Sequence, residues 1–243
     1  MGSFFNFGCN RINYGNHLSF PVGQRCLHAE FKTRVHAALE VCVQTCSAKL
    51  VLGDLDVVVM AAPKFVISRL GVNGYAYDAH QILLQLDPDH DSLAQNLEHR
   101  VSALLAHELH HCARSLACGG LTGTFGKALV SERLACCFEE EIVGVTPFYA
   151  IECMGTVLRQ FAAKAKAHVD VPYSQLPGGW ANWMFGSLTG DAAFPYQCGY
   201  STGYGLIRCW LDATGNQASS SAGIDPNAVI TAWQRGEIAP FGC

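Results

Sequence analysis

Two histidines and a glutamate stand close together in the segment His107-Glu108-Leu109-His110-His111, which fits the pattern HExxH. If this segment is helical, His107 and His111 lie one turn apart on one face, where their imidazoles can bind a single metal ion. Glu108 is rotated by about 100° from His107, close enough to hold a water molecule beside that metal. These residue types at this spacing predict a zinc-dependent hydrolase and favour a peptidase.

The residues that flank the motif help to decide whether it is a metal site or a chance match to the pattern. The alternative explanation is a helix with a solvated His/Glu face. The flanking runs Leu104-Leu105-Ala106 and Cys112-Ala113 carry no charge, which is unusual for such a face. A helix of this composition is expected to be buried, and buried His and Glu side chains need partners, which a shared metal supplies. His110 lies to the other side of His107 and is not expected to be a ligand.

A catalytic zinc usually has three protein ligands and one open position, so a third ligand must come from elsewhere in the chain. The metzincin continuation HExxHxxGxxH is absent, because Arg114 and Ala117 occupy the positions of its Gly and final His. The glutamate-type zincins, or gluzincins, instead take a Glu from a later helix. Glu132, in the apolar stretch Ala128–Ala135, fits that arrangement.

Two alternatives to this ligand assignment stay open. Glu132 could be a helix-surface residue paired with Arg133 or Lys127. Three consecutive acids further on are competing ligands: Glu139, Glu140 and Glu141. We rank these acids below Glu132, because a run of acids at a helix end more often forms a solvated face.

Three segments of the chain share patterns with a known family. They are Ala106–His111, then Ala128–Glu132, which is close to a family pattern EALVSEGLA, and Cys198–Tyr204, which is close to GYxxGY. On these segments the chain resembles the bacterial family of predicted zinc-dependent proteases, long described as a domain of unknown function. The resemblance covers most of the chain and implies a zincin. The chain departs from it at Arg133, where Gly is usual, and at Cys136, where thermolysin-like enzymes have an Asp that supports a zinc histidine.

The expected mechanism uses one Zn²⁺ held by His107, His111 and Glu132. The metal would lower the pKa of a water molecule in its open position and polarise the scissile carbonyl. Glu108 would accept the water proton as general base and pass it to the leaving amine.

Two tyrosines are candidates for a further catalytic role. Tyr200 and Tyr204 are spaced i,i+4 in the GYxxGY segment, where either hydroxyl could stabilise the oxyanion of the tetrahedral intermediate. Their neighbours Gly199 and Gly203 would allow close approach. The alternative is that both are core tyrosines at a helix crossing lined by these glycines.

Composition predicts one globular domain. The chain has 243 residues, of which 50% are hydrophobic and 15% are charged, enough for one substantial core over residues 1–243, with residues 1–27 considered as an irregular N-terminal extension. The net charge of −4 and the scattered basic residues argue against nucleic acid as a partner. There is no apolar run of about 18 residues and no Sec-type leader, so we expect no membrane span and a cytoplasmic location. We expect the 12 cysteines to be mainly reduced thiols, with a second zinc or a redox switch left open.

The pattern of apolar residues predicts an α+β, zincin-like domain in which a small sheet packs on the motif helix and further helices follow. The expected helices are 28–50, 93–116, 125–141, 149–167, 199–213 and 226–235, and the expected strands are 55–61, 74–77 and 81–86. The strand 81–86, which precedes the motif helix, is expected to be an exposed edge that binds an extended peptide by main-chain hydrogen bonds. The alternative is an ordinary hairpin strand. Residues 170–195 are expected to be irregular and to form a lid or a substrate wall.

Three functions compete at this stage. The first is an endopeptidase that acts on extended peptide or protein segments. The second is an aminopeptidase-type trimming enzyme, which lacks support because no GxMEN-like motif is present. The third is a non-catalytic metal-binding module that recognises a partner through the segment Trp180–Phe185. Glu108 argues against this third function, since a pure binder does not need that acid.

Overall fold

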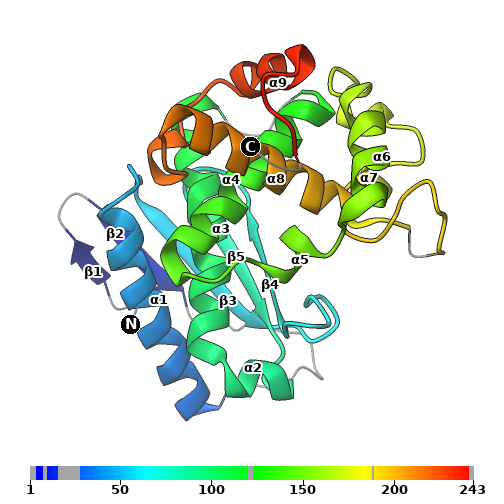
Figure 1. Cartoon of the computed structure of the whole chain (residues 1–243). Helices are drawn as coiled ribbons and strands as arrows, with labels where there is room; N and C mark the ends of the chain where they lie inside the picture. Colours follow the sequence, from blue (N-terminus) through cyan, green and yellow to red (C-terminus); the bar gives the residue numbers. More distant parts are fainter. Residues whose placement is uncertain (1–3, 8–9, 16–27, 120–122, 188, 241–243) are drawn as a thin grey trace. The chain divides into compact units, whose positions relative to one another are not determined.

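The computed structural model describes residues 4–7, 10–15, 28–119, 123–187 and 189–240. The chain divides into two compact units, Met1–Gly120 and Leu121–Cys243. The first unit combines a sheet with helices, and the second is built from helices (Figure 1). Across the described ranges no helix has both the length and the apolar content that crossing a membrane requires.

The first unit contains a five-stranded sheet in the order β1-β2-β3-β5-β4. The strands are β1 (Phe4–Phe7), β2 (Asn10–Gly15), β3 (Leu55–Ala61), β4 (Val72–Ala76) and β5 (Gln81–Leu86). β2 and β5 both run parallel to β3, whereas β1 and β4 are antiparallel to β2 and β5 respectively. The expectation of an irregular segment over residues 1–27 is therefore wrong where β1 and β2 form.

The edge of the sheet next to the motif helix is β4, so the prediction that 81–86 is the edge strand is wrong. β5 lies between β3 and β4 and pairs with both. The physical reason is burial: Ile82, Leu84 and Leu86 of β5 have no exposed surface, whereas Tyr75 of β4 is 58% exposed. Either strand of a hairpin can dock onto a sheet, and here the more apolar strand takes the inner position.

The motif lies on α3 (Leu97–Cys118), which packs against α1 (Ala29–Ser47) and β4. The sequence predicts one helix over 93–116, but the structure has a short helix α2 (Asp91–Gln95) and then α3, with a break at Asn96. The motif lies within α3 and is not interrupted by this break. Apolar residues of α3 such as Val101, Leu105 and Leu109 are buried. This interior face holds the motif helix against the sheet.

In the second unit, the long helices α4 (Phe125–Val143) and α8 (Cys198–Thr214) pack against each other. Around α8 lie α5 (Phe148–Ile151), α6 (Gly155–Lys166) and α7 (Trp180–Phe185), and α9 (Pro226–Arg235) packs on α4. Two single turns, η1 (Tyr173–Gln175) and η2 (Ser219–Ser221), complete the unit. The expected helix 149–167 is split at Gly155, which has a φ of 65° that favours glycine.

The prediction that 170–195 is irregular is wrong where η1 and α7 form, whereas its role as a lid or a substrate wall stays a prediction. This segment contains α7, whose Trp183 has no exposed surface and donates from Nε1 to the Pro177 carbonyl at 2.8 Å. Phe125, Phe161 and Phe194 surround the indole ring, with ring centroids 5.2, 5.8 and 5.5 Å away. Trp183 and Phe194 of this segment therefore contribute to the core of the second unit.

Two glycines of α8 lie where neighbouring segments come closest. A Cβ on Gly199 would lie 2.0 Å from the Trp183 carbonyl oxygen, and one on Gly203 would lie 2.3 Å from Cγ of Arg133. The glycines of GYxxGY thus allow close packing of α7 and α4 on α8. This is the helix-crossing alternative that the sequence left open.

The structure joins Cys153 and Cys198 in a disulfide, with the two Cα atoms 5.0 Å apart. The bond links the turn between α5 and α6 to the first residue of α8, and Cys209 is also disulfide-bonded. The expectation of reduced thiols is wrong for these three residues. It fits six others among the described residues, which are free: Cys42, Cys46, Cys112, Cys118, Cys136 and Cys137.

Replacing Gly199 with Ala tests the close packing of α8. The added methyl group collides with a backbone oxygen, so we expect a loss of about 1–3 kcal/mol in the free energy of unfolding. This outweighs the gain of about 0.5–1 kcal/mol that Ala brings to a helix interior. Chemical denaturation measures the difference. Asp212→Ala on the exposed side of α8 is the control and should stay within about 1 kcal/mol of the unchanged protein; a stabilised G199A protein would contradict the packing.

Candidate metal centre

α3 presents His107 and His111 on the same face, as the i,i+4 spacing predicts. Their ring centroids are 5.0 Å apart, and His107 is buried with 8% of its surface exposed. A buried imidazole is costly unless its ring nitrogens have polar partners. Two rings held side by side at one helix turn offer two nitrogen ligands to one metal ion.

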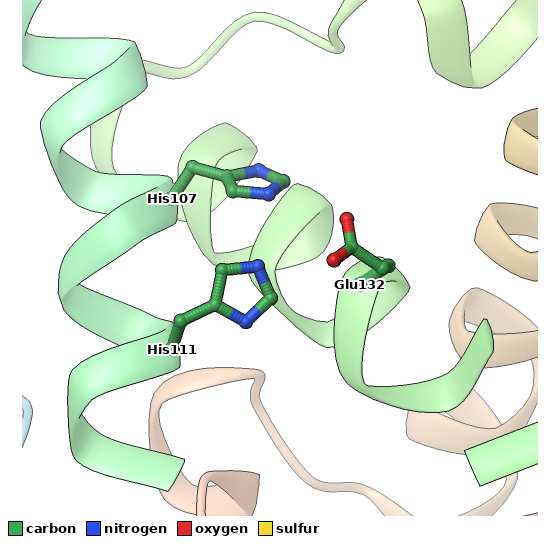
Figure 2. Close-up of side chains that lie close together, drawn as sticks. All are labelled: His107, His111 and Glu132. Carbon is green, nitrogen blue, oxygen red and sulfur yellow. The ribbon is translucent and has the colours of Figure 1, made fainter. Parts of the chain in front are cut away.

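The structure brings Glu132 of α4 to these histidines. The potential ligand atoms of His107, His111 and Glu132 all lie within 4.8 Å of one another, and Figure 2 shows both imidazoles and the carboxylate directed toward one another. Two nitrogens and one carboxylate oxygen form a donor set suited to zinc.

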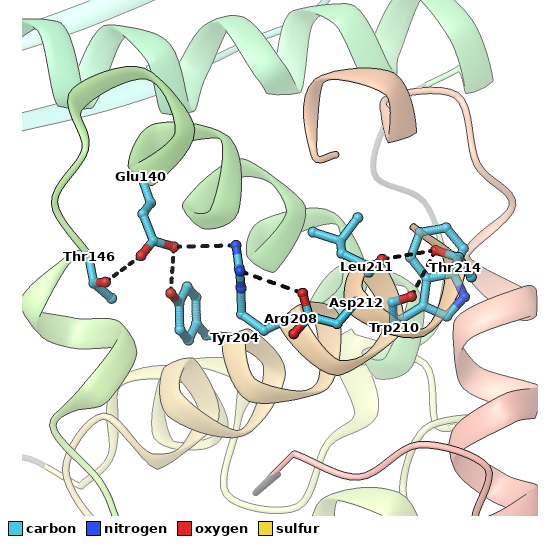
Figure 3. Close-up of polar contacts among 8 residues, drawn as sticks. All are labelled: Glu140, Thr146, Tyr204, Arg208, Trp210, Leu211, Asp212 and Thr214. Carbon is cyan, nitrogen blue, oxygen red and sulfur yellow. Dashed lines mark hydrogen bonds and ion pairs between the residues drawn. The ribbon is translucent and has the colours of Figure 1, made fainter. Parts of the chain in front are cut away.

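The competing acids of α4 have other partners. Tyr149 donates a hydrogen bond to Glu139, and Ser219 donates to Glu141 at 2.7 Å. Glu140 accepts from Thr146 and from the Tyr204 hydroxyl, each at 2.5 Å (Figure 3). Glu139 is buried rather than on the solvated face that the sequence predicts. In the described part of the chain, the group of potential metal ligands contains Glu132 and none of these three.

Glu108 is held between α3 and the edge strand β4. Only 6% of its surface is exposed, and its Oε2 accepts a hydrogen bond from the backbone N–H of Ala76 at 2.8 Å. Gly74 makes room for it, because a Cβ there would lie 2.8 Å from Cγ and 2.9 Å from Oε1 of Glu108. Sequence reasoning identified Glu108 but missed both of these backbone contacts, since they depend on which strand lies at the edge.

The register of β4 shows which backbone groups point away from the sheet. Tyr77 donates to Gln81 at 2.9 Å, and Gly71 accepts from Asp87 at 2.9 Å, so these odd-numbered residues face β5. In an antiparallel pair the alternate residues face the other way, which places the groups of Gly74 and Ala76 at the outer edge. The Ala76 N–H that binds Glu108 belongs to this outward set. The carboxylate therefore lies beside the edge of β4.

The two tyrosines of GYxxGY contribute to packing in the second unit. The Tyr204 hydroxyl donates to Glu140, and burial together with this bond raises the pKa of Tyr204. The Tyr200 ring lies against Arg133, whose Cζ is 3.3 Å from the ring centroid. The Tyr204 hydroxyl is therefore directed at Glu140, and an oxyanion role for either tyrosine stays a prediction.

Comparison with known proteins identifies the family. The profile of the family described as "Predicted Zn-dependent protease (DUF2268)" matches residues 35–231. This is most of the chain, and the chain belongs to this family, as the resemblance of its sequence motifs implied. No curated protein and no solved structure matches it.

Zinc binding tests the three ligands directly. We expect one zinc ion per chain, and His107→Ala or Glu132→Ala should weaken binding by more than ~100-fold, because even residues that only support a ligand cost 10–100-fold. Competition with a chromophoric chelator measures the affinity. His99→Ala is the matched control, since His99 is an exposed residue of the same helix. Unchanged affinity in the Glu132 variant would remove it from the ligand set.

Proposed function

We propose that this protein is a zinc-dependent peptidase of the glutamate type, with His107, His111 and Glu132 as ligands of one zinc ion. The observation that carries this proposal is the grouping of their three ligand atoms within 4.8 Å. The family's description as a predicted Zn-dependent protease supports it. A bound zinc ion would polarise the substrate carbonyl and make a neighbouring water more acidic.

Glu108 is the proposed general base. It takes a proton from the attacking water and delivers it to the nitrogen of the leaving amine, so that the peptide bond breaks as the carbonyl carbon becomes a carboxylate. The Ala76 N–H donates to Oε2, and a carboxylate can accept several hydrogen bonds, so this contact is compatible with proton uptake by the same group. The same bond keeps the carboxylate in one orientation, and Gly74 permits its close approach. Tyr200 and Tyr204 remain candidate oxyanion donors, although the Tyr204 hydroxyl already donates to Glu140.

The proposed substrate is a peptide or protein segment in an extended conformation. Such a segment can add to β4 by hydrogen bonds to the outward-facing backbone groups of Gly74 and of the Ala76 carbonyl. This assigns to β4 the role that the sequence gave to 81–86. A strand added there runs past Glu108, because the carboxylate is bonded to the same edge. An extended segment lying along this edge suits internal cleavage, which we propose over removal of single terminal residues.

The structure weakens the alternative of a non-catalytic metal-binding module. That alternative used the segment Trp180–Phe185 as a partner-binding loop, but this segment is helix α7, with Trp183 and Met184 buried. It also gives no role to a buried Glu108 that is directed to the sheet edge by a backbone hydrogen bond. The proposed peptidase uses that arrangement.

Cleavage of a mixed peptide library by the zinc-loaded protein, read by mass spectrometry, tests the activity. Glu108→Gln is the matched variant, because a glutamine can still accept from the Ala76 N–H but is a far weaker base. We expect internal cuts with the unchanged protein and a loss of about 10²–10⁴-fold in kcat for the variant. Cuts of equal rate in both proteins would remove Glu108 from the mechanism. An absence of cuts in both, with zinc bound, would favour the binding module.

Replacing Gly74 with Ala tests the role of the sheet edge. The methyl group overlaps Glu108, so the carboxylate must move, and a displacement of about 1 Å can cost about 10²-fold in kcat. We expect this loss with zinc affinity unchanged, because Gly74 contacts none of the proposed ligands. Gly53→Ala is the control: it adds a methyl in the same unit, against the His80 ring. Wild-type kcat in G74A would show that the position of Glu108 does not limit catalysis.

A further inference from the structure

Arg133 is a fully buried cation beside the proposed ligand Glu132. None of its side-chain surface is exposed, and its Nη2 lies 3.5 Å from Oε2 of Glu132, whose side chain is 18% exposed. A buried charge without a partner is strongly destabilising, and Glu132 is one of the partners that the structure gives this cation. The sequence treated a pair with Arg133 as an alternative to metal binding by Glu132, but a carboxylate has two oxygens and can make both contacts.

The second unit holds the guanidinium in one place. Its Cζ lies 3.3 Å from the centroid of the Tyr200 ring, and its Nη1 donates to the Cys136 sulfur at 3.5 Å. The stem crosses α8 at Gly203, where any side chain would collide with it. The Tyr200 ring is itself packed edge-on against Tyr149, with ring centroids 5.1 Å apart. Contacts with the Tyr200 ring, the Cys136 sulfur and the backbone at Gly203 therefore hold the Arg133 side chain.

Two nitrogens of the Arg133 side chain have N–H groups that donate no hydrogen bond to the described residues. Nε and Nη2 are buried and make no hydrogen bond in the described part of the chain, although Nη2 forms the ion pair with Glu132. Burial alone would lower the pKa of Arg133, but Cys136, Tyr200 and Glu132 outweigh it and the net pKa is raised. The guanidinium is thus a permanent cation whose Nη2 lies 3.5 Å from Oε2 of Glu132.

We propose that Arg133 is a positioning residue that pairs with Oε2 of Glu132 and so favours metal binding through one oxygen of that carboxylate rather than through both. This inference rests on the proposed metal site and specifies how its carboxylate ligand binds. A carboxylate free to rotate can bind a cation through both oxygens, which fills a position that a water or substrate needs. By holding one oxygen, Arg133 keeps that position open. Its place beside the ligand is the one in which other zinc sites have hydrogen-bonded supporting groups.

The number of metal–oxygen bonds is the readout that tests this role. Affinity alone is a poor measure, because the guanidinium repels the metal cation while it orders the carboxylate, and the two effects oppose each other. We would record zinc X-ray absorption and the visible spectrum of the Co²⁺-substituted protein for the unchanged chain and for Arg133→Met. We expect about one additional oxygen ligand in the variant and weaker Co²⁺ visible bands, since these bands lose intensity as the coordination number rises.

Three further variants complete the experiment. Arg133→Lys restores a cation near Glu132 and should recover part of the Co²⁺ band intensity. Tyr200→Leu removes the ring that holds the guanidinium and should lower the intensity, which keeps the test valid if Arg133→Met does not fold. Arg208→Met is the control and should leave the spectrum unchanged, because Arg208 pairs with Glu140 at 3.9 Å and with Asp212 at 3.6 Å instead (Figure 3).

The outcomes separate this inference from the proposed function. If the unchanged protein binds no zinc or cobalt, the metal site itself is wrong and the role of Arg133 falls with it. If it binds one ion and Arg133→Met and Tyr200→Leu give the spectrum of the unchanged protein, the peptidase proposal stands and the positioning role of Arg133 is overturned. A spectrum that changes equally in Arg208→Met would also overturn it, because the effect would then follow from the loss of any arginine.

Discussion

The cost of burying ionisable side chains is the constraint on which the rest of the structure depends. His107, Glu108 and Arg133 all have less than a tenth of their surface exposed. Each therefore needs a partner of fixed geometry. Glu108 has the Ala76 N–H, Arg133 has Glu132 and the Tyr200 ring, and the histidines offer nitrogens suited to a metal. These partners determine where the proposed catalytic groups lie.

In the first unit, this need links the motif helix to the edge of the sheet. β4 contains a glycine where Glu108 approaches, and it presents an outward backbone N–H to the carboxylate. An inner strand could not do so, because its N–H groups are used by neighbouring strands on both sides. The position of β4 rather than β5 at the edge therefore matters for the proposed site. Only an edge strand can form hydrogen bonds with both the proposed base and an added peptide strand.

In the second unit, the packing of α4 against α8 positions Glu132. Glycines in α8 let the helices approach, and Arg133 fills the groove that Gly203 leaves. About two helix turns further along α4, Glu140 joins the same two helices through Tyr204 and Arg208 (Figure 3). The disulfide between Cys153 and Cys198 fixes the first residue of α8. Contacts with α8 therefore hold α4 at several points along its length.

The sequence by itself determined the elements and the chemistry that depend on local spacing. The i,i+4 histidines, the acid between them, the strands β3 and β5 and the helix α9 lie where periodicity and turn residues predict, because each is defined by neighbours in the chain. Glu132 was identified from its apolar surroundings and from a resemblance. What only the tertiary structure decided is which strand takes the edge, which cysteines pair and what the GYxxGY tyrosines contact. These outcomes depend on the relative burial of segments far apart in sequence, and so does the role of Arg133, whose stacking on Tyr200 no local pattern records.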